Sequence, residues 1–284
     1  MNRQRQGAEP WQVADYRSLE IKELFRLLAS LHITLTEESF LLYAQENETP
    51  EELLECLWVH EEDLVSQEKA YLLLFELWRR LCPYQKSLSI FCDALDHQIS
   101  LFEQHQEGIE ELLLDSLDEL EDLLDQGVDE GMTAQEVFQE VTSYLAHDLE
   151  GFLYDYIYDL LEGGNEEVAL SLVDGFASYV SDKKWFDLLK GRLLSLSYQE
   201  EAERLIFDLL EQQEESPDVP FLLEFSAFLI HQKDPLSARA IQLLSSQVCT
   251  EQQRQEMLTL QASFHESIGK EQVQQQILSL FAKQ

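Results

Sequence analysis

Apolar residues recur every three or four positions along almost the whole chain, and this period is the strongest constraint on the fold. Residues at that spacing share one face of an α-helix, so each such run predicts an amphipathic helix with one buried side. In the segment 109–126 this stripe consists of Ile109, Leu113, Leu117, Leu120 and Leu124. Glycine and proline are scarce, at ten and six among 284 residues, which favours long regular elements. We therefore predict an all-α protein.

Local signals for helix starts support the same prediction. Thr49-Pro-Glu-Glu52 and Thr133-Ala-Gln-Glu136 are capping boxes, in which the first side chain accepts from the backbone of the fourth residue and the fourth returns the bond. Related motifs begin at Ser197 and Thr250. The block 152–158 alternates like a strand, but no second strand is present to pair with it. We expect this block to be helical too.

Small or medium-sized residues recur in the C-terminal half at nearly constant spacing. They are expected to open the second helices of successive hairpins, and they are Ala169, Ala202, Ala238 and Val273. The intervals are 33, 36 and 35 residues, a period that is typical of stacked helical hairpins.

The region from about 153 to 281 resembles degenerate tetratricopeptide repeats. Its clearest unit has large, large, small and large residues in the first helix and two small ones in the second: Leu222, Phe225, Ser226, Leu229, Ala238 and Ser245. Lys190, Ser226 and Gln261 replace the usual glycine of the first helix. The resemblance implies an α-solenoid that binds other proteins and does not catalyse a reaction.

We expect three regions along the chain. Residues 1–10 form a disordered N-terminus, and residues 11–130 form an N-terminal helical bundle that contains an acidic helix at 109–126. Residues 131–284 form the tetratricopeptide-like repeats. The bundle is expected to continue into the α-solenoid of stacked hairpins.

The segment 87–182 contains 25 acidic residues and neither lysine nor arginine, and the whole chain has a net charge of −37. Nucleic acids and anionic membranes are bound through clustered basic side chains, so direct binding to either is disfavoured. Ordinary surface helices mix signs to form i,i+4 pairs. The segment is therefore either a solvated surface or a surface that attracts a basic protein or peptide.

The candidate contacts for such a partner fall into two groups. The first comprises acidic residues of the segment 109–126: Asp115, Asp118, Glu119 and Asp122. In an alternative hypothesis these carboxylates imitate phosphates and inhibit a DNA-binding protein. The second group is aromatic: Tyr154, Tyr158, Phe225 and Phe228. The block 152–158 either lines a peptide groove or fills the core, and the two phenylalanines bind a partner only if they face the concave side.

No sequence motif indicates catalysis. The chain has no Gly-x-Ser-x-Gly and no glycine-rich phosphate loop, and its histidines show no ligand spacing. The acidic loop expected at 126–131 lacks the alternating ligands of a calcium site. We therefore expect no enzyme, no metal and no cofactor; a metal-dependent enzyme that uses helix carboxylates is a third hypothesis.

The four cysteines form no Cys-x-x-Cys pair, and Cys56, Cys82 and Cys92 fall in helical apolar patterns where buried thiols are expected. The chain shows no secretory signal and no apolar run of membrane-spanning length. These features favour a cytoplasmic location. The function expected overall is a non-enzymatic scaffold, adaptor or chaperone-like module whose acidic middle favours a basic partner. The sequence does not indicate an oligomeric state.

Overall fold

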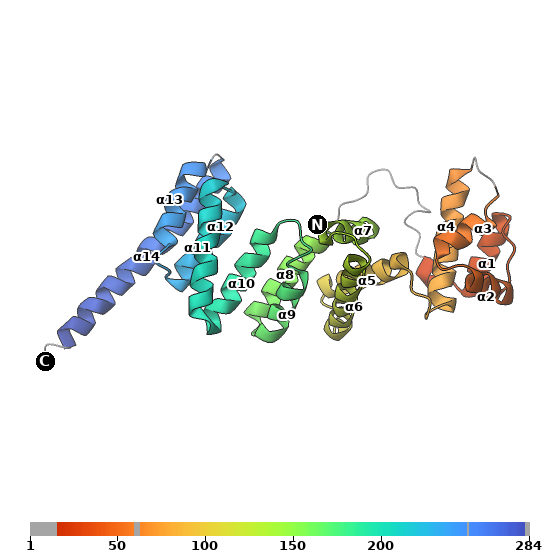
Figure 1. Cartoon of the computed structure of the whole chain (residues 1–284), viewed down its shortest axis with the longest axis horizontal. Coiled ribbons are helices and arrows are strands. Elements are labelled where there is room, and N and C mark those ends of the chain that lie inside the picture. The colour runs from red at the N-terminus through yellow and green to blue at the C-terminus, as the bar shows by residue number, and fades with distance from the viewer. Residues whose placement is uncertain (1–15, 60–62, 249, 282–284) are drawn as a thin grey trace. The chain divides into compact units, whose positions relative to one another are not determined.

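The computed structural model describes residues 16–59, 63–248 and 250–281, with side chains in the last helix described as far as Glu266 (Figure 1). Within these ranges the chain forms fourteen α-helices, one short 3-10 helix and no strand, so the predicted all-α fold is confirmed. The disordered N-terminus predicted for residues 1–10 lies outside the described residues.

The helices follow one another with short connections. In chain order they are η1 (Tyr16–Ser18), α1 (Ile21–Ser30), α2 (Glu37–Glu46), α3 (Pro50–Leu57), α4 (Leu64–Leu81), α5 (Leu88–Glu103), α6 (Ile109–Asp129), α7 (Ala134–Tyr144), α8 (Leu149–Glu162), α9 (Glu166–Phe176), α10 (Lys183–Ser197), α11 (Gln199–Glu215), α12 (Val219–Gln232), α13 (Ser237–Gln247) and α14 (Glu251–Phe281). None of the described helices is long and apolar enough to cross a membrane.

The chain divides into two compact units. The first unit holds the residues up to Glu119 together with Glu140–His147. The second unit holds Leu120–Gln139 and the chain from Asp148 onward. Helices α6 and α7 therefore contribute residues to both units.

Most of the predicted helix starts are observed. Thr49 caps α3 by accepting from the backbone N–H of Glu52 at 3.2 Å. At α7 both halves of the capping box form, because Thr133 N–H donates to Glu136 Oε2 at 2.9 Å and Glu136 N–H donates to Thr133 Oγ1 at 3.3 Å. The start predicted at Ser197 is wrong, since α10 continues through that residue and α11 begins at Gln199.

The acidic helix α6 is longer than predicted. Its leucine stripe is buried as expected, but the helix continues through Gly127 to Asp129, where a loop was predicted. The glycine at position 127 therefore does not end the helix but allows the close approach of α7. A β-carbon at this position would lie 2.7 Å from Cγ2 of Val137, so glycine permits the contact within a continuous helix.

Helices α1 to α4 of the first unit surround a core of leucines and large aromatic side chains. Phe40 and Trp78 are fully buried and meet edge to face, with ring centroids 6.5 Å apart. The Trp78 indole N–H donates to the carbonyl of Gln85 at 2.9 Å, which satisfies its polar atom inside the core. Burial of such rings supplies much of the apolar stabilisation of a helical unit.

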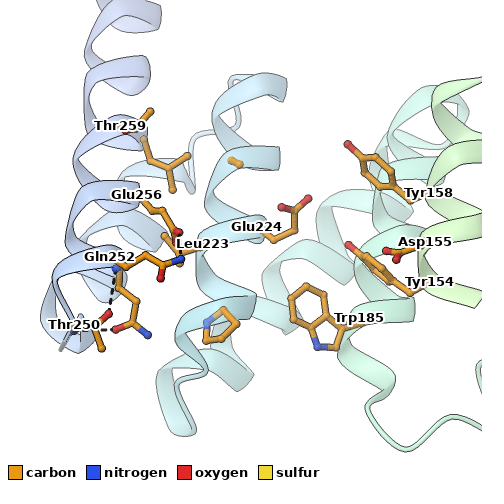
Figure 2. A pocket seen from close by; sticks show the side chains of 14 residues that line it. Tyr154, Asp155, Tyr158, Trp185, Leu223, Glu224, Thr250, Gln252, Glu256 and Thr259 are labelled. Carbon is orange, nitrogen blue, oxygen red and sulfur yellow. Dashed lines mark hydrogen bonds between the residues drawn. The ribbon is translucent and has the colours of Figure 1, made fainter. Parts of the chain in front are cut away.

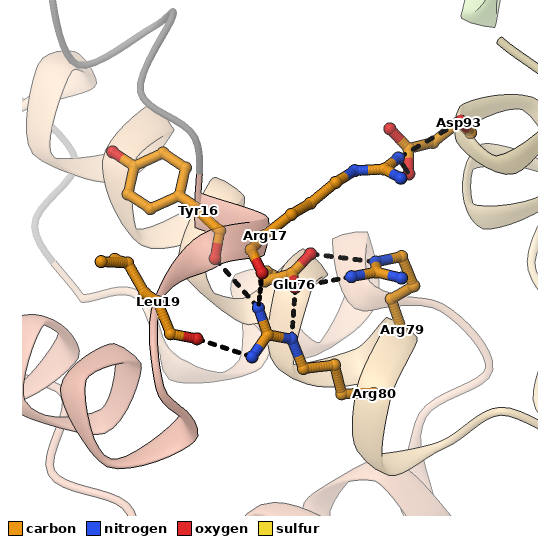
Figure 3. A network of polar contacts seen from close by, with 7 residues as sticks. All are labelled: Tyr16, Arg17, Leu19, Glu76, Arg79, Arg80 and Asp93. Atoms are coloured by element: carbon orange, nitrogen blue, oxygen red, sulfur yellow. Dashed lines mark hydrogen bonds and ion pairs between the residues drawn. The ribbon is translucent and has the colours of Figure 1, made fainter. Parts of the chain in front are cut away.

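A polar network fixes η1 against α4 (Figure 3). Arg80 donates to the backbone carbonyls of Tyr16, Arg17 and Leu19 at 3.0, 2.7 and 2.7 Å. The buried carboxylate of Glu76 accepts from both Arg80 and Arg79. Because Glu76 holds the guanidinium that binds the η1 carbonyls, it supports the N-terminal turn through Arg80.

The second unit is built from consecutive helix pairs, α8 with α9, α10 with α11 and α12 with α13. Helices α8, α10, α12 and α14 also contact one another in succession, so they form a row along one side of these pairs. The small residues Ala169 and Ala202 are buried at the predicted positions.

Two features of the predicted repeat pattern differ from the structure. In α13 the buried small residue is Ala240, whereas Ala238 is exposed, so the register of this helix is shifted by two residues. No new helix begins at Val273, because α14 is continuous from Glu251 to Phe281. Ala240 is buried because its position on α13 faces the core cluster of α11 and α12.

Candidate functional site: an acidic aromatic groove

A groove of about 900 Å³ follows the row of helices α8, α10, α12 and α14 in the second unit (Figure 2). Tyr154, Asp155 and Tyr158 of α8 form one side of it, and Glu256 and its neighbours on α14 form the other. Between them lie residues of α10 and α12, including Trp185 and Glu224. The groove is large enough to hold a short peptide segment.

The aromatic block of α8 supplies residues to both the core and the groove. Residues four apart share a helix face, so Phe152 and Tyr156 stack together with ring centroids 5.7 Å apart, and Tyr156 is buried. Tyr154 and Tyr158 lie on a different face and line the groove. The predicted helix is confirmed, with one face packed in the core and another lining the groove, and peptide binding there stays a hypothesis.

A chain of aromatic rings connects the groove to the core. Tyr154 meets Trp185 edge to face at 5.4 Å, Trp185 meets Phe221 at 5.1 Å, and Phe221 stacks on Phe225 at 5.6 Å. These contacts join α8 to α12 through the first turn of α10, so the groove rings are held by packed neighbours. Trp185 is not among the contact residues predicted from the sequence; only its place in the folded unit shows that it lines the groove.

Two predicted contact residues belong to the core. Phe225 is fully buried and Phe228 is 6% exposed, and both pack in the cluster formed by α10 to α13. Their side chains are therefore closed to a partner, which corrects their assignment as contacts. The helical period places them on the inner face of α12, whereas Leu223, Glu224 and Ala227 of the same helix line the groove.

Arg192 occupies a special position behind the groove wall. Its guanidinium lies between the rings of Tyr158 and Phe228, with its central carbon 4.9 and 5.4 Å from their centroids. It is also ion-paired with Glu224. The arginine is only 9% exposed, so this aromatic and carboxylate setting replaces most of its hydration.

The three carboxylates of the groove differ in their partners. Glu224 pairs with Arg192, and Glu256 accepts from the side chain of Gln252 at 3.0 Å. Asp155 makes no hydrogen bond or ion pair with any described residue. Partial desolvation by its neighbours raises the pKa of the Asp155 carboxyl above its ordinary value, and the nearby charges of Asp159 and Asp148 raise it further.

A second hollow of about 480 Å³ shares Tyr154, Asp155 and Trp185 with the groove. Its other acidic lining residues include Asp148 and Glu150. Among the described residues that line either hollow, none is lysine or arginine. The surface that both share is therefore aromatic and negatively charged.

The hydroxyl of Tyr154 is shielded from solvent and has no hydrogen-bond partner in the described part of the chain. Burial raises the pKa of Tyr154 to about 12, so the hydroxyl keeps its proton at neutral pH. The hydroxyl is therefore a hydrogen-bond donor that no described residue uses.

The four predicted acidic contacts of α6 are not part of the groove lining. Asp115, Asp118 and Asp122 are exposed, whereas Glu119 is half-buried and binds Lys86 Nζ through both of its oxygens at 2.7 Å. Lys86 thus neutralises Glu119 in part. Attraction of a basic partner and imitation of phosphates both stay hypotheses for the three exposed carboxylates.

Other chemically suggestive groups have structural explanations. Asp96 lies 2.6 Å from His147 Nδ1, and Ser100 Oγ lies 3.4 Å from His147 Nε2. Ser100 is inside α5, where the backbone N–H groups are bound within the helix, so these groups cannot serve as oxyanion-hole donors. Asp96 also accepts from the backbone N–H groups of Ala146 and His147, which ties the turn after α7 to α5.

The remaining chemically reactive groups are the potential metal ligands and the thiols. Across the described residues, no group of three or more histidine, cysteine, aspartate or glutamate side chains is placed to hold a metal ion. Cys82 and Cys92 are buried as predicted, whereas Cys56 is exposed on α3, which corrects that expectation. Burial raises the pKa of Cys92 to about 12 and keeps its thiol protonated.

Comparisons with protein-family models, with curated proteins and with solved structures found no match for this chain.

Proposed function

We propose that the protein is a non-enzymatic interaction module that binds a basic segment of another protein in the groove of its second unit. The observation that carries this proposal is the lining of the groove. Tyr154 and Trp185 offer aromatic surface, Asp155 offers an unpaired carboxylate, and no described lining residue is basic. Aromatic rings beside carboxylates favour lysine and arginine side chains of a partner.

The helix pairs of the second unit support a repeat-type role. Stacked hairpins bind partners along an extended surface, and the row formed by α8, α10, α12 and α14 provides such a surface here. We infer that these hairpins are stacked in the manner of tetratricopeptide repeats. A scaffold, adaptor or chaperone-like protein is the role that this design suits best.

The exposed carboxylates of α6 have a separate role in this proposal. Unpaired surface charge raises association rates with an oppositely charged protein more than it raises affinity. We infer that Asp115, Asp118 and Asp122 accelerate the approach of the basic partner. A reducing compartment such as the cytoplasm fits the free thiols of Cys56, Cys82 and Cys92.

Selection from a displayed library of random short peptides tests the proposal. The full-length chain should enrich sequences that combine basic with apolar residues. Replacing Asp155 and Glu256 by Asn and Gln should weaken the enriched peptides by about tenfold, because each lost charge contact contributes about 0.5–1 kcal/mol. Enrichment without a preference for basic residues would contradict the proposed function.

Two matched variants separate the groove from general charge effects. Glu167→Gln with Glu215→Gln removes the same charge from exposed positions on α9 and α11 and should leave peptide affinity within about twofold. Asp115→Asn with Asp118→Asn should lower the association rate at low salt and leave the dissociation rate unchanged. An association rate that does not depend on salt in the unmodified chain would refute the role of α6.

A further inference from the structure

Arg192 shows how this unit holds a cation away from water. Its guanidinium lies between two aromatic rings, 4.9 Å from the centroid of Tyr158 and 5.4 Å from that of Phe228. The carboxylate of Glu224 completes its surroundings. Tyr158 therefore already contacts a cation of this chain.

Two aromatic rings and a carboxylate also come together one helical turn earlier on α8, at a corner formed by Tyr154, Asp155 and Trp185. The rings of Tyr154 and Trp185 meet edge to face, with centroids 5.4 Å apart and planes at 77°, and Asp155 lies beside Tyr154 on the same helix (Figure 2). All three residues line both the groove and the adjoining hollow. The corner is therefore reached from both sides.

This corner differs from the Arg192 site because no described cation pairs with its carboxylate, although Lys184 binds Asp182 of the adjoining hollow at 2.6 Å. None of the described residues that line the two hollows is lysine or arginine, and Asp155 has no partner among the described residues. The neighbouring charges of Asp159 and Asp148 add to the negative potential at Asp155. A positive group bound here would reduce the repulsion among these carboxylates and would also contact the aromatic rings.

Resting on the function proposed above, we propose that the corner of Tyr154, Asp155 and Trp185 binds one arginine side chain of the partner segment. A guanidinium is flat and weakly hydrated, so it stacks on rings while it donates to a carboxylate, as Arg192 does. A lysine ammonium is compact and strongly hydrated, and it fits this setting less well.

The test uses the full-length chain and acetyl-Leu-Arg-Leu-amide as the probe, with the indole N–H signal of Trp185 observed by NMR and assigned through Trp185→Phe. The arginine peptide should shift this signal with saturable binding. Replacing arginine by its neutral isostere citrulline should weaken binding by about five- to tenfold, and lysine should give an intermediate affinity.

Asp155→Asn should reduce the affinity for the arginine peptide by a similar factor, whereas Glu256→Gln should change it less than about twofold. Both positions are exposed, so both variants should keep the helical circular dichroism of the unmodified chain. Equal binding of the citrulline peptide, or equal effects of the two substitutions, would overturn the arginine subsite.

The two proposals can fail separately. If the library yields basic peptides that depend on the groove while the arginine peptide leaves Trp185 unchanged, the subsite is wrong and the proposed function stands. If the arginine peptide binds at Trp185 while the library shows no basic preference, the proposed function is wrong and the arginine subsite stands alone.

Discussion

Two charged side chains, Glu76 and Arg192, are almost entirely withdrawn from water, at 4% and 9% exposure. Burying a charge costs free energy unless opposite charge and hydrogen bonds replace its hydration. Glu76 meets this condition through Arg79 and Arg80. Arg192 meets it only in part, through Glu224 and two rings, because its buried Nε atom has no hydrogen-bond partner among the described residues. Glu76 thus contacts two arginines, and Arg192 contacts one carboxylate and two rings, so a change at either residue affects several neighbours.

Replacing Glu76 by Gln should destabilise the first unit by about 1–3 kcal/mol, because Arg79 and Arg80 lose their charged acceptor. Arg80 should then hold the carbonyls of η1 less firmly. Urea unfolding followed by circular dichroism measures the loss. Glu55→Gln, at an exposed position of α3, should stay within about 0.5 kcal/mol and serves as the control.

The effect of Glu76 should depend on pH. Burial raises the pKa of Glu76, but the hydrogen bonds and charges of Arg79 and Arg80 outweigh it and hold this pKa below its ordinary value of 4.5. A lowered carboxylate pKa stabilises the folded state above the unfolded pKa, and this contribution is lost as pH falls through the folded value. The difference between the unmodified chain and Glu76→Gln should therefore be full above about pH 4.5 and shrink below it. A difference that grows on acidification would refute this assignment.

Among the helices, α6 and α7 meet at a contact that permits only glycine at position 127. A β-carbon there would lie 2.7 and 2.8 Å from the two methyl groups of Val137. Valine is restricted at χ1 and cannot rotate away easily. Gly127→Ala should therefore destabilise the second unit by about 1–3 kcal/mol despite the higher helix propensity of alanine.

Gly191 in α10 provides the matched control for this contact. A β-carbon at Gly191 would lie 3.7 Å from Ile206 and 3.9 Å from Leu205, which is ordinary contact distance. Gly191→Ala should stabilise the chain by about 0.4–1 kcal/mol. The double variant Gly127→Ala with Val137→Ala should lose less free energy of unfolding than the sum of the losses in the two single variants. Losses that are strictly additive would disprove the steric explanation.

For the molecule as a whole, net charge is the dominant physical property. A charge of −37 opposes compaction through self-repulsion, and salt screens that repulsion. The thermal midpoint should therefore rise between about 20 mM and about 500 mM sodium chloride, as the Debye length falls below about 10 Å. Magnesium at equal ionic strength should give a similar rise. A large rise with micromolar magnesium would instead indicate a specific metal site and revive the third hypothesis.

Local sequence determined much of the secondary structure. The leucine stripe of α6, the helical state of the aromatic block in α8 and the caps at Thr49 and Thr133 all depend on residues within one or two turns of each other. Such signals act within one helix, so they can be recognised before any packing is known. The distribution of charge along the chain also follows from the sequence alone, because each residue type has a known charge at neutral pH.

Only the tertiary structure decided which of these residues form the site. Tyr154 and Tyr158 share the same helical period, yet Arg192 contacts Tyr158, and Trp185 is brought to Tyr154 from another helix. Phe225 is buried in the core, and the buried small residue of α13 is Ala240 instead of the expected Ala238. Periodicity shows that a helix has a buried face but not which neighbour covers it, because that depends on contacts between residues far apart in the chain.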